Sequence, residues 1–256
     1  MEISPLYKWL RLLNRFPSHD LNDKDYYGEF GRQFLSNSDI YTLLNNPRGF
    51  RKPVQESKPL IEGRYFHTYM LEPEKIETFK VSEAKSRNST QYKKDLHDYK
   101  EDMLILQHEV DHLNKLCGIM KANFKFFDDI YASSNKYEVP GVTFLKGEQW
   151  KGKADILCED RIIDLKTTSD ISKFHISAKK YNYDSQAYIY QQIFGLPVHF
   201  YAIDKNSMLL GVYKPTEAFL ESGERKVERA VNIYRQFFSE DAEISIDDFY
   251  FDELLH

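Results

Sequence analysis

The segment KGKADILCEDRIIDLKTT, which begins at Lys151, constrains the fold of this chain most strongly. Two apolar runs flank the turn-forming pair Glu159–Asp160, which predicts two short strands joined by a tight turn. The predicted partners across this hairpin are Cys158 with Arg161, Leu157 with Ile162, Ile156 with Ile163, and Asp155 with Asp164. Because side chains alternate between the faces of a strand, Lys166 is expected beside Asp164 on the same face.

Two facing carboxylates are unfavourable unless something binds between them. At ~5 Å and an effective dielectric of about 20, Asp155 and Asp164 would repel each other by roughly 3 kcal/mol. The apolar residues around them predict a strand pair buried on both faces, where carboxylates need a partner or a metal. Exposed turn carboxylates fit this setting poorly, although a salt bridge to Lys166 remains open in the metal-free protein. Hard oxygen ligands suit Mg²⁺, so the pattern predicts a metal-dependent phosphodiesterase centre.

The pattern resembles the signature of the PD-(D/E)XK nucleases, with Ala154 where that signature often has proline. Three further segments resemble the phage and prophage exonucleases of the exonuclease VIII type. They are SNSDIYTLLNNP at residues 36–47, IEGRYFHTYMLEP at residues 61–73 and YDSQAYIY at residues 183–190. Their order matches, and the resemblance covers roughly residues 36–195.

The resemblance implies roles for residues that the hairpin alone does not select. His67 would be a metal ligand together with Asp155, Asp164 and the backbone carbonyl of Leu165. Taken by itself, a histidine among aromatic residues is more often a hydrogen-bonded core residue. Lys166 would position the attacking water and stabilise the phosphate. Three residues of the YDSQAYIY segment would line the site: Gln186 and Tyr190, which share one helix face, and Tyr183 beside them.

The same resemblance implies an activity and partners. It implies an exodeoxyribonuclease that uses one or two Mg²⁺ ions, with Mn²⁺ as a substitute, and digests linear duplex DNA from its ends in the 5′→3′ direction. The product would be a 3′ strand for a single-strand annealing protein, and the enzyme would form a homo-oligomeric ring. A single-strand-specific or endonucleolytic enzyme, a catalytically silent DNA-end-binding module, and an interaction protein with a coincidental motif are the alternatives.

The fold expected from the pattern is an α/β, restriction-endonuclease-like core within a single domain of 256 residues. A mainly helical part, 1–135, precedes the catalytic sheet and helix, 136–215, and a C-terminal helix with an acidic tail, 216–256. Helices are expected at 5–16, 38–46, 61–71, 98–119, 121–132, 181–194 and 215–238, with a polar loop at 81–94. Strands are expected at 137–145, 152–158, 161–167, 197–204 and 208–213, which gives a mixed sheet of about five strands.

The net charge of −5 requires that basic residues gather at one place if the chain binds DNA. Five such candidates come from short basic clusters and are Arg48, Arg51, Lys153, Lys179 and Lys180. The two arginines are the candidates for holding a terminal 5′-phosphate. Glu138, just ahead of the hairpin, either adds a carboxylate to the site or is an exposed strand residue.

The cellular location follows from features that the sequence lacks. Two cysteines, Cys117 and Cys158, have no metal-binding spacing and give no reason to expect a disulfide. Charges interrupt the apolar residues of the N-terminus, and no apolar run approaches the ~18 residues that a membrane span needs. We therefore expect a cytoplasmic protein with no membrane association.

Overall fold

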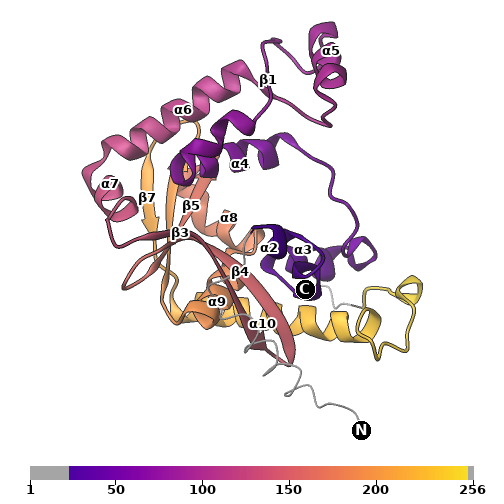
Figure 1. The fold of residues 1–256 in the computed structure, drawn as a ribbon. Helices are drawn as coiled ribbons and strands as arrows, with labels where there is room; N and C mark the ends of the chain where they lie inside the picture. The colour runs from indigo at the N-terminus through magenta and orange to yellow at the C-terminus, as the bar shows by residue number, and fades with distance from the viewer. Residues whose placement is uncertain (1–22, 253–256) are drawn as a thin grey trace.

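A mixed sheet of five strands forms the centre of the protein (Figure 1), whose computed structural model describes residues 23–252. The strands are β3 (Lys136–Leu145), β4 (Glu148–Leu157), β5 (Ile162–Thr168), β6 (Val198–Asp204) and β7 (Leu210–Tyr213), and they lie in this order across the sheet. Among the neighbouring strands of this sheet, only β5 and β6 pair in parallel. The predicted α/β architecture with five mixed strands is confirmed.

Helices cover both faces of the sheet. One face packs against α4 (Lys58–Leu71), α6 (Gln107–Ala122) and α7 (Phe124–Ile130), of which α4 and α6 lie above the sheet in Figure 1. The other face packs against α3 (Asn37–Asn45), α8 (Phe174–Lys180), α9 (Tyr183–Phe194) and α10 (Glu217–Phe237). The central strands are therefore apolar on both sides, which explains their nearly continuous apolar sequence.

Shorter elements connect these layers. They are α2 (Asp23–Tyr27), η1 (Gly31–Gln33), η2 (Pro47–Gly49), η3 (Pro73–Thr78), β1 (Val81–Ser82), α5 (Thr90–Tyr99), β2 (Ile105–Leu106), η4 (Ile171–Lys173) and η5 (Ile246–Asp248). β1 and β2 form a separate two-stranded parallel sheet. Within residues 23–252, no helix has both the length and the apolarity that crossing a lipid bilayer requires.

Two glycines allow α9 to approach its neighbours closely. A side chain at Gly152 on β4 would place its Cβ 2.7 Å from the ring of Tyr190, and one at Gly223 on α10 would lie 2.1 Å from the backbone oxygen of Asp184. The buried carboxylate of Asp184 also accepts hydrogen bonds from Lys226 (2.8 Å) and Ser222 (2.9 Å). α9 is therefore fixed against both the sheet and α10.

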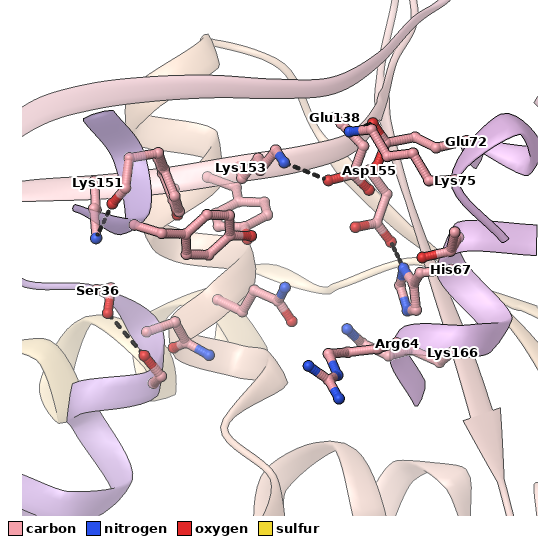
Figure 2. Close-up of a pocket in the computed structure, with 18 of the residues that line it drawn as sticks. Ser36, Arg64, His67, Glu72, Lys75, Glu138, Lys151, Lys153, Asp155 and Lys166 are labelled. Atoms are coloured by element: carbon pink, nitrogen blue, oxygen red, sulfur yellow. Dashed lines mark hydrogen bonds and ion pairs between the residues drawn. The ribbon is translucent and has the colours of Figure 1, made fainter. Parts of the chain in front are cut away.

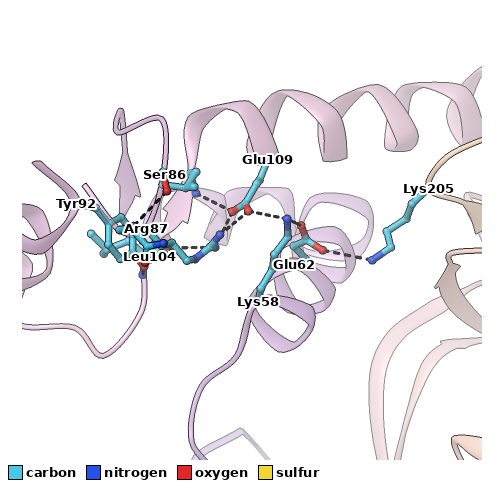
Figure 3. Close-up of polar contacts among 10 residues, drawn as sticks. Lys58, Glu62, Ser86, Arg87, Tyr92, Leu104, Glu109 and Lys205 are labelled. Carbon is cyan, nitrogen blue, oxygen red and sulfur yellow. Dashed lines mark hydrogen bonds and ion pairs between the residues drawn. The ribbon is translucent and has the colours of Figure 1, made fainter. Parts of the chain in front are cut away.

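An ion-pair network around the buried carboxylate of Glu109 joins α4, α6 and the segment between β1 and α5 (Figure 3). Glu109 on α6 accepts hydrogen bonds from both terminal nitrogens of Arg87, at 2.6 and 2.7 Å, and forms an ion pair with Lys58 at 2.9 Å. Its Oε2 also accepts a hydrogen bond from the backbone N–H of Leu106. We refer to Lys58, Arg87 and Glu109 as the α4–α6 network.

Most predicted elements are present, with displaced ends. The capping box of Ser36 and Asp39 starts α3, and Pro47 follows it as expected. The predicted helix at 61–71 begins earlier, at Lys58, and the helix predicted at 215–238 begins at Glu217, with Thr216 as its N-cap. The predicted helix at 5–16 lies outside the described residues.

Local structure between β1 and α9 differs from the prediction in three places. The polar loop predicted at 81–94 contains β1 and the first residues of α5. The helix predicted at 98–119 is present as α6 but begins only at Gln107, because Lys100 has the left-handed backbone conformation (φ 56°) that ends α5 and β2 follows it. The separate helix α8, ahead of α9, was also not predicted.

Candidate active site

The hairpin of β4 and β5 opens where the two aspartates lie. Cys158 donates a backbone hydrogen bond to Arg161 (2.9 Å), and the pairs Leu157–Ile162 and Ile156–Ile163 form as predicted. The ladder ends there, so Asp155 does not pair with Asp164 across the hairpin. Instead the Asp155 Oδ2 atom accepts a hydrogen bond from the backbone N–H of Leu165 at 2.8 Å. The separation of the strands leaves the Asp155 carboxylate facing a cleft.

Three potential metal ligands meet in this cleft. One ligand atom from each of His67 on α4, Glu138 on β3 and Asp155 on β4 lies within 4.8 Å of the other two. His67 Nδ1 is 3.2 Å from Asp155 Oδ2. In Figure 2 the three side chains point toward one another at one end of the cleft. We call these residues the donor group; a histidine nitrogen and two carboxylates suit a divalent cation.

The backbone places Glu138 in the donor group. Residues on either side of Glu138 and Asp155 pair between β3 and β4, but these two do not. Glu138 has φ of 51°, a conformation that non-glycine residues seldom adopt and that costs about 1–3 kcal/mol. Such strain persists only where surrounding structure enforces it, and here the adjoining strand pairs hold it in place. Glu138 also forms an ion pair with Lys153 at 2.9 Å.

Asp164 is not part of the donor group and interacts instead with Lys166 and Gln186. Its side chain is fully buried; Gln186 Nε2 donates a hydrogen bond to Oδ2 at 2.7 Å, and the Lys166 ammonium forms an ion pair with Oδ1. Among the described residues, Oδ1 accepts no geometrically favourable hydrogen bond. The predicted metal ligand Asp164 is therefore held mainly by one amide and one ammonium group, and its Oδ1 retains capacity for a further ligand.

Electrostatic interactions divide the site into an ion pair and two carboxyl groups with a raised pKa. Burial lowers the pKa of His67 and raises that of Asp155, but their mutual attraction outweighs burial and shifts both pKa values the other way. Burial and the nearby Asp155 carboxylate raise the pKa of Glu138. Burial raises the pKa of Asp164 to about 6, even though Lys166 opposes the change. A cation that binds here replaces protons on these groups.

Lys166 remains a cation in this setting. Burial lowers the pKa of Lys166, but the Asp164 carboxylate more than offsets this and raises the pKa above its ordinary value. The ammonium also lies 4.7 Å from the centroid of the Tyr183 ring, which adds a cation–π contact. Tyr190, buried beside Gln186 on the cleft side of α9, has a pKa raised by burial and stays a neutral phenol.

The cleft has a volume of about 920 Å³ and concentrates positive charge. Five lysine and arginine residues line it, against three acidic residues. The five are Arg64, Lys75, Lys151, Lys153 and Lys166. The chain as a whole carries a net charge of −5, so the balance of charge in the cleft is opposite to that of the protein. An anionic ligand is therefore favoured in the cleft over the rest of the surface.

The predicted DNA-binding residues divide between the cleft and the outer surface. Lys153 lines the cleft, and Tyr183 contacts Lys166. Arg48 donates instead to the backbone oxygen of Asp247 (2.6 Å), and Arg51 lies over the ring of Phe50 at 4.9 Å. Lys179 and Lys180 are exposed on α8. The last four residues do not line the cleft, so their placement gives no support to the roles predicted for them.

Several cleft residues were missed by the sequence analysis. Arg64 precedes His67 by three positions and therefore shares its helix face, a signal that was available. Lys151 lies on the same face of β4 as the predicted residues Lys153 and Asp155 by simple alternation, a second signal that was available. Lys75 and the aromatic residues of α2 come close only through the tertiary fold. Leu165 is buried, so only its backbone is available to the site.

Comparison with known proteins places this geometry in a family. The model of a family described as "PDDEXK-like domain of unknown function (DUF3799)" matches residues 39–243. The comparison with curated proteins gave no match.

Two solved structures are similar to the fold to different degrees. A crystal structure from Eubacterium rectale, named "Putative exonuclease", has a TM-score of 0.64 and 18% sequence identity, and the alignment covers 93% of this chain and 96% of that one. The crystal structure of SSO0001 has a TM-score of only 0.33 at 16% identity, and the alignment covers 88% of this chain and 87% of that one. A score this low does not indicate a shared fold. The first likeness agrees with the restriction-endonuclease-like fold expected from the sequence.

Proposed function

The chain belongs to this family of PDDEXK-like domains, and on that premise we propose that it is a metal-dependent deoxyribonuclease. The observation that carries the proposal is the donor group of His67, Glu138 and Asp155 beside the Lys166 ammonium in a positively charged cleft. A structural role does not explain why three potential ligands converge on a solvent-accessible cleft whose other charged side chains are mostly cationic.

The donor group would hold the cation, with Asp164 and the Leu165 carbonyl as the further ligands that the resemblance implies. The donor set fits a divalent ion such as Mg²⁺, with Mn²⁺ as a substitute, because it offers hard oxygen atoms and one imidazole. When bound, one or two such ions polarise the phosphate and lower the pKa of coordinated water.

The residues of the chain supply positioning and charge. Lys166, a cation that reaches the cleft, stabilises negative charge that develops on the phosphate and orients the attacking water. Gln186 fixes the Asp164 carboxylate through its 2.7 Å hydrogen bond, which also keeps Lys166 in place through the Asp164 ion pair. Tyr190 forms part of the cleft wall, and its neutral phenol O–H can donate a hydrogen bond to a bound group.

The finer proposal concerns the substrate and its biological use. We propose that the enzyme digests linear double-stranded DNA from its ends, 5′→3′, and exposes 3′ single strands for recombination by an annealing protein. The support is the resemblance of residues 36–195 to exonucleases of the exonuclease VIII type. A homo-oligomeric ring in the cytoplasm of a bacterium or phage-infected cell belongs to the same proposal.

The test uses linear duplex DNA labelled at the 5′ ends and a closed circular control, with Mg²⁺ or EDTA. Wild type is compared with Lys166→Ala. We expect Mg²⁺-dependent release of 5′-labelled mononucleotides from linear DNA, none from the circle, and none with the variant. Equal cutting of linear and circular DNA would show an endonuclease in place of the proposed exonuclease. No cleavage with any divalent metal would contradict the proposal that the protein is a nuclease.

A further inference from the structure

An exposed aromatic ring lies beside the donor group without any role in the chemistry above. Tyr27, the last residue of α2, lines the cleft and is 64% exposed. The ring of the preceding residue, Tyr26, is buried and packs edge-on against it, with centroids 4.9 Å apart and planes at 78°. Tyr27 therefore presents an aromatic surface to the cleft from a supported position.

Two lysines line the same side of the cleft next to these rings. The Lys151 ammonium lies 4.5 Å from the centroid of the Tyr26 ring, and the Lys153 ammonium lies 5.4 Å from that of Tyr27. Figure 2 shows Lys151, Lys153 and Asp155 following one another along β4. Same-face residues of a strand are about 6.6 Å apart, which is comparable to the spacing of successive phosphates along one nucleic-acid strand.

Lys153 connects the aromatic surface to the donor group. Its ammonium contacts the Tyr27 ring on one side and the Glu138 carboxylate, 2.9 Å away, on the other. A nucleotide whose base lies on Tyr27 and whose phosphate lies near Lys153 would direct its neighbouring phosphate toward Asp155 and His67. The order of these residues along the cleft thus fits a strand that passes base-stacking, phosphate-binding and reactive positions in turn.

We propose that the cleft binds a single DNA strand and that Tyr27 stacks on one unpaired base of it, next to the scissile phosphate. This inference rests on the proposed nuclease function and specifies its substrate at the reacting position. Sites of about 300–1,000 Å³ enclose drug-sized ligands, so a cleft of about 920 Å³ accommodates a few nucleotides and not a turn of duplex. Stacking on aromatic rings beside cations is the usual way in which proteins bind single strands independently of sequence.

The test measures stacking directly, in EDTA, so that no cleavage is needed. A short oligodeoxythymidylate that carries one 2-aminopurine is titrated with wild type, Tyr27→Phe and Tyr27→Leu. Tyr41→Leu is the matched control, because Tyr41 is 60% exposed on α3 and lies outside the cleft. We expect wild type, Tyr27→Phe and Tyr41→Leu to quench the fluorescence. Tyr27→Leu should quench little and bind on the order of ten- to hundredfold more weakly.

Two results would overturn the inference. One is equal quenching by Tyr27→Leu and wild type. The other is equal quenching of a fully paired duplex with 2-aminopurine inside the terminal pairs, which would show that the base does not need to be unpaired. Cleavage assays on the same proteins separate this from the proposed function. If quenching depends on Tyr27 but no divalent metal supports cleavage, only the proposed nuclease function is contradicted. If the protein cleaves DNA but quenching does not depend on Tyr27, only the proposed stacking is contradicted.

Discussion

Glu109 in the α4–α6 network and Asp164, which pairs with Lys166 beside the cleft, are both buried carboxylates, yet their surroundings have opposite effects on their pKa. Burial raises the pKa of Glu109, but Arg87, the Leu106 N–H and Lys58 outweigh it and bring the pKa to about 2. Asp164 has one ammonium and one amide, and burial raises its pKa to about 6. Glu109 has its hydrogen-bonding capacity filled, whereas Asp164 does not.

The difference distinguishes a structural carboxylate from one available for chemistry. Glu109 joins two helices and a connecting segment, and its partners lie on both sides of it. The carboxylates of the cleft lie near one another, so each disfavours the charge of the next. Only a site that gains an additional cation benefits from the second arrangement. The following predictions test the contrast, beginning with the largest expected effect.

The largest effect is expected on activity from a change in the donor group. Asp155→Asn should lower the rate of DNA cleavage on the order of 10³-fold or more, because it removes charge from the metal ligands. Its free energy of unfolding without metal should stay within about 1 kcal/mol of wild type, since repulsion from Glu138 is relieved as the His67 pair is lost. Cleavage rates and urea denaturation measure both. Glu109→Gln is the matched control and should keep the wild-type cleavage rate. If Glu109→Gln lost as much activity as Asp155→Asn, the two carboxylates would not differ in the way proposed.

The reverse pattern is expected from the α4–α6 network. Arg87→Met leaves the Glu109 carboxylate buried with fewer partners and should lower the free energy of unfolding by about 3 kcal/mol. Cleavage per folded molecule should remain near that of wild type. The double variant Arg87→Met/Glu109→Gln should recover part of the lost stability in urea denaturation. Unchanged stability of Arg87→Met would show that Lys58 alone satisfies Glu109.

The pH dependence of stability should run in opposite directions for the two carboxylates in the metal-free protein. The folded pKa of Glu109, about 2, is below its unfolded value of about 4.3, so its contribution is present above pH 4.3 and is lost as the pH falls toward 2. The folded pKa of Asp164, about 6, is above its unfolded value of about 3.9, so its contribution is present below pH 3.9 and is lost as the pH rises through 6.

Each change should be on the order of 2–3 kcal/mol. Urea denaturation across this pH range, for wild type against Glu109→Gln and Asp164→Asn, measures the two contributions. The free energy of unfolding of wild type minus that of Asp164→Asn should fall between pH 4 and 6. If this value rose with pH instead, the Asp164 carboxylate would be stabilised as an anion, as Glu109 is.

The smallest effect concerns lysines inside and outside the cleft. Lys153→Gln should weaken binding of single-stranded DNA several-fold and reduce the slope of log affinity against log salt by about 1, since one phosphate contact is lost. Lys179→Gln, on the exposed face of α8, should change neither. Fluorescence anisotropy over a range of salt concentrations measures both slopes. Equal slopes of log affinity against log salt for the two variants would contradict the assignment of the cleft as the phosphate-binding surface.

The sequence predicts the hairpin and its carboxylates because these depend on local rules. Alternation along β4 and β5 and a tight turn are enough to place Asp155, Asp164 and Lys166. The predicted pairing fails only at the aspartates, where the strands separate. At that point the Asp155 carboxylate accepts a hydrogen bond from the Leu165 N–H, an interaction that strand alternation does not predict.

The remainder of the site depends on contacts between distant segments. Glu138 faces the cleft because its backbone has a positive φ, which a β-strand pattern does not predict. The placement of Arg48 gives no support to its predicted role, because it donates to the backbone oxygen of Asp247, 199 residues further along the chain, which no local pattern indicates. His67 was predicted only through resemblance, since a single histidine on a helix carries little information by itself.

The most direct test of the account is a titration of the metal-free protein with Mn²⁺, followed by the loss of the free-ion signal in electron paramagnetic resonance. Wild type and Glu109→Gln should bind Mn²⁺ with the same affinity, and Asp155→Asn should bind at least tenfold more weakly. Equal binding by wild type and Asp155→Asn would contradict the claim that the open carboxylates of the cleft, and not the buried carboxylate of the α4–α6 network, form a metal site.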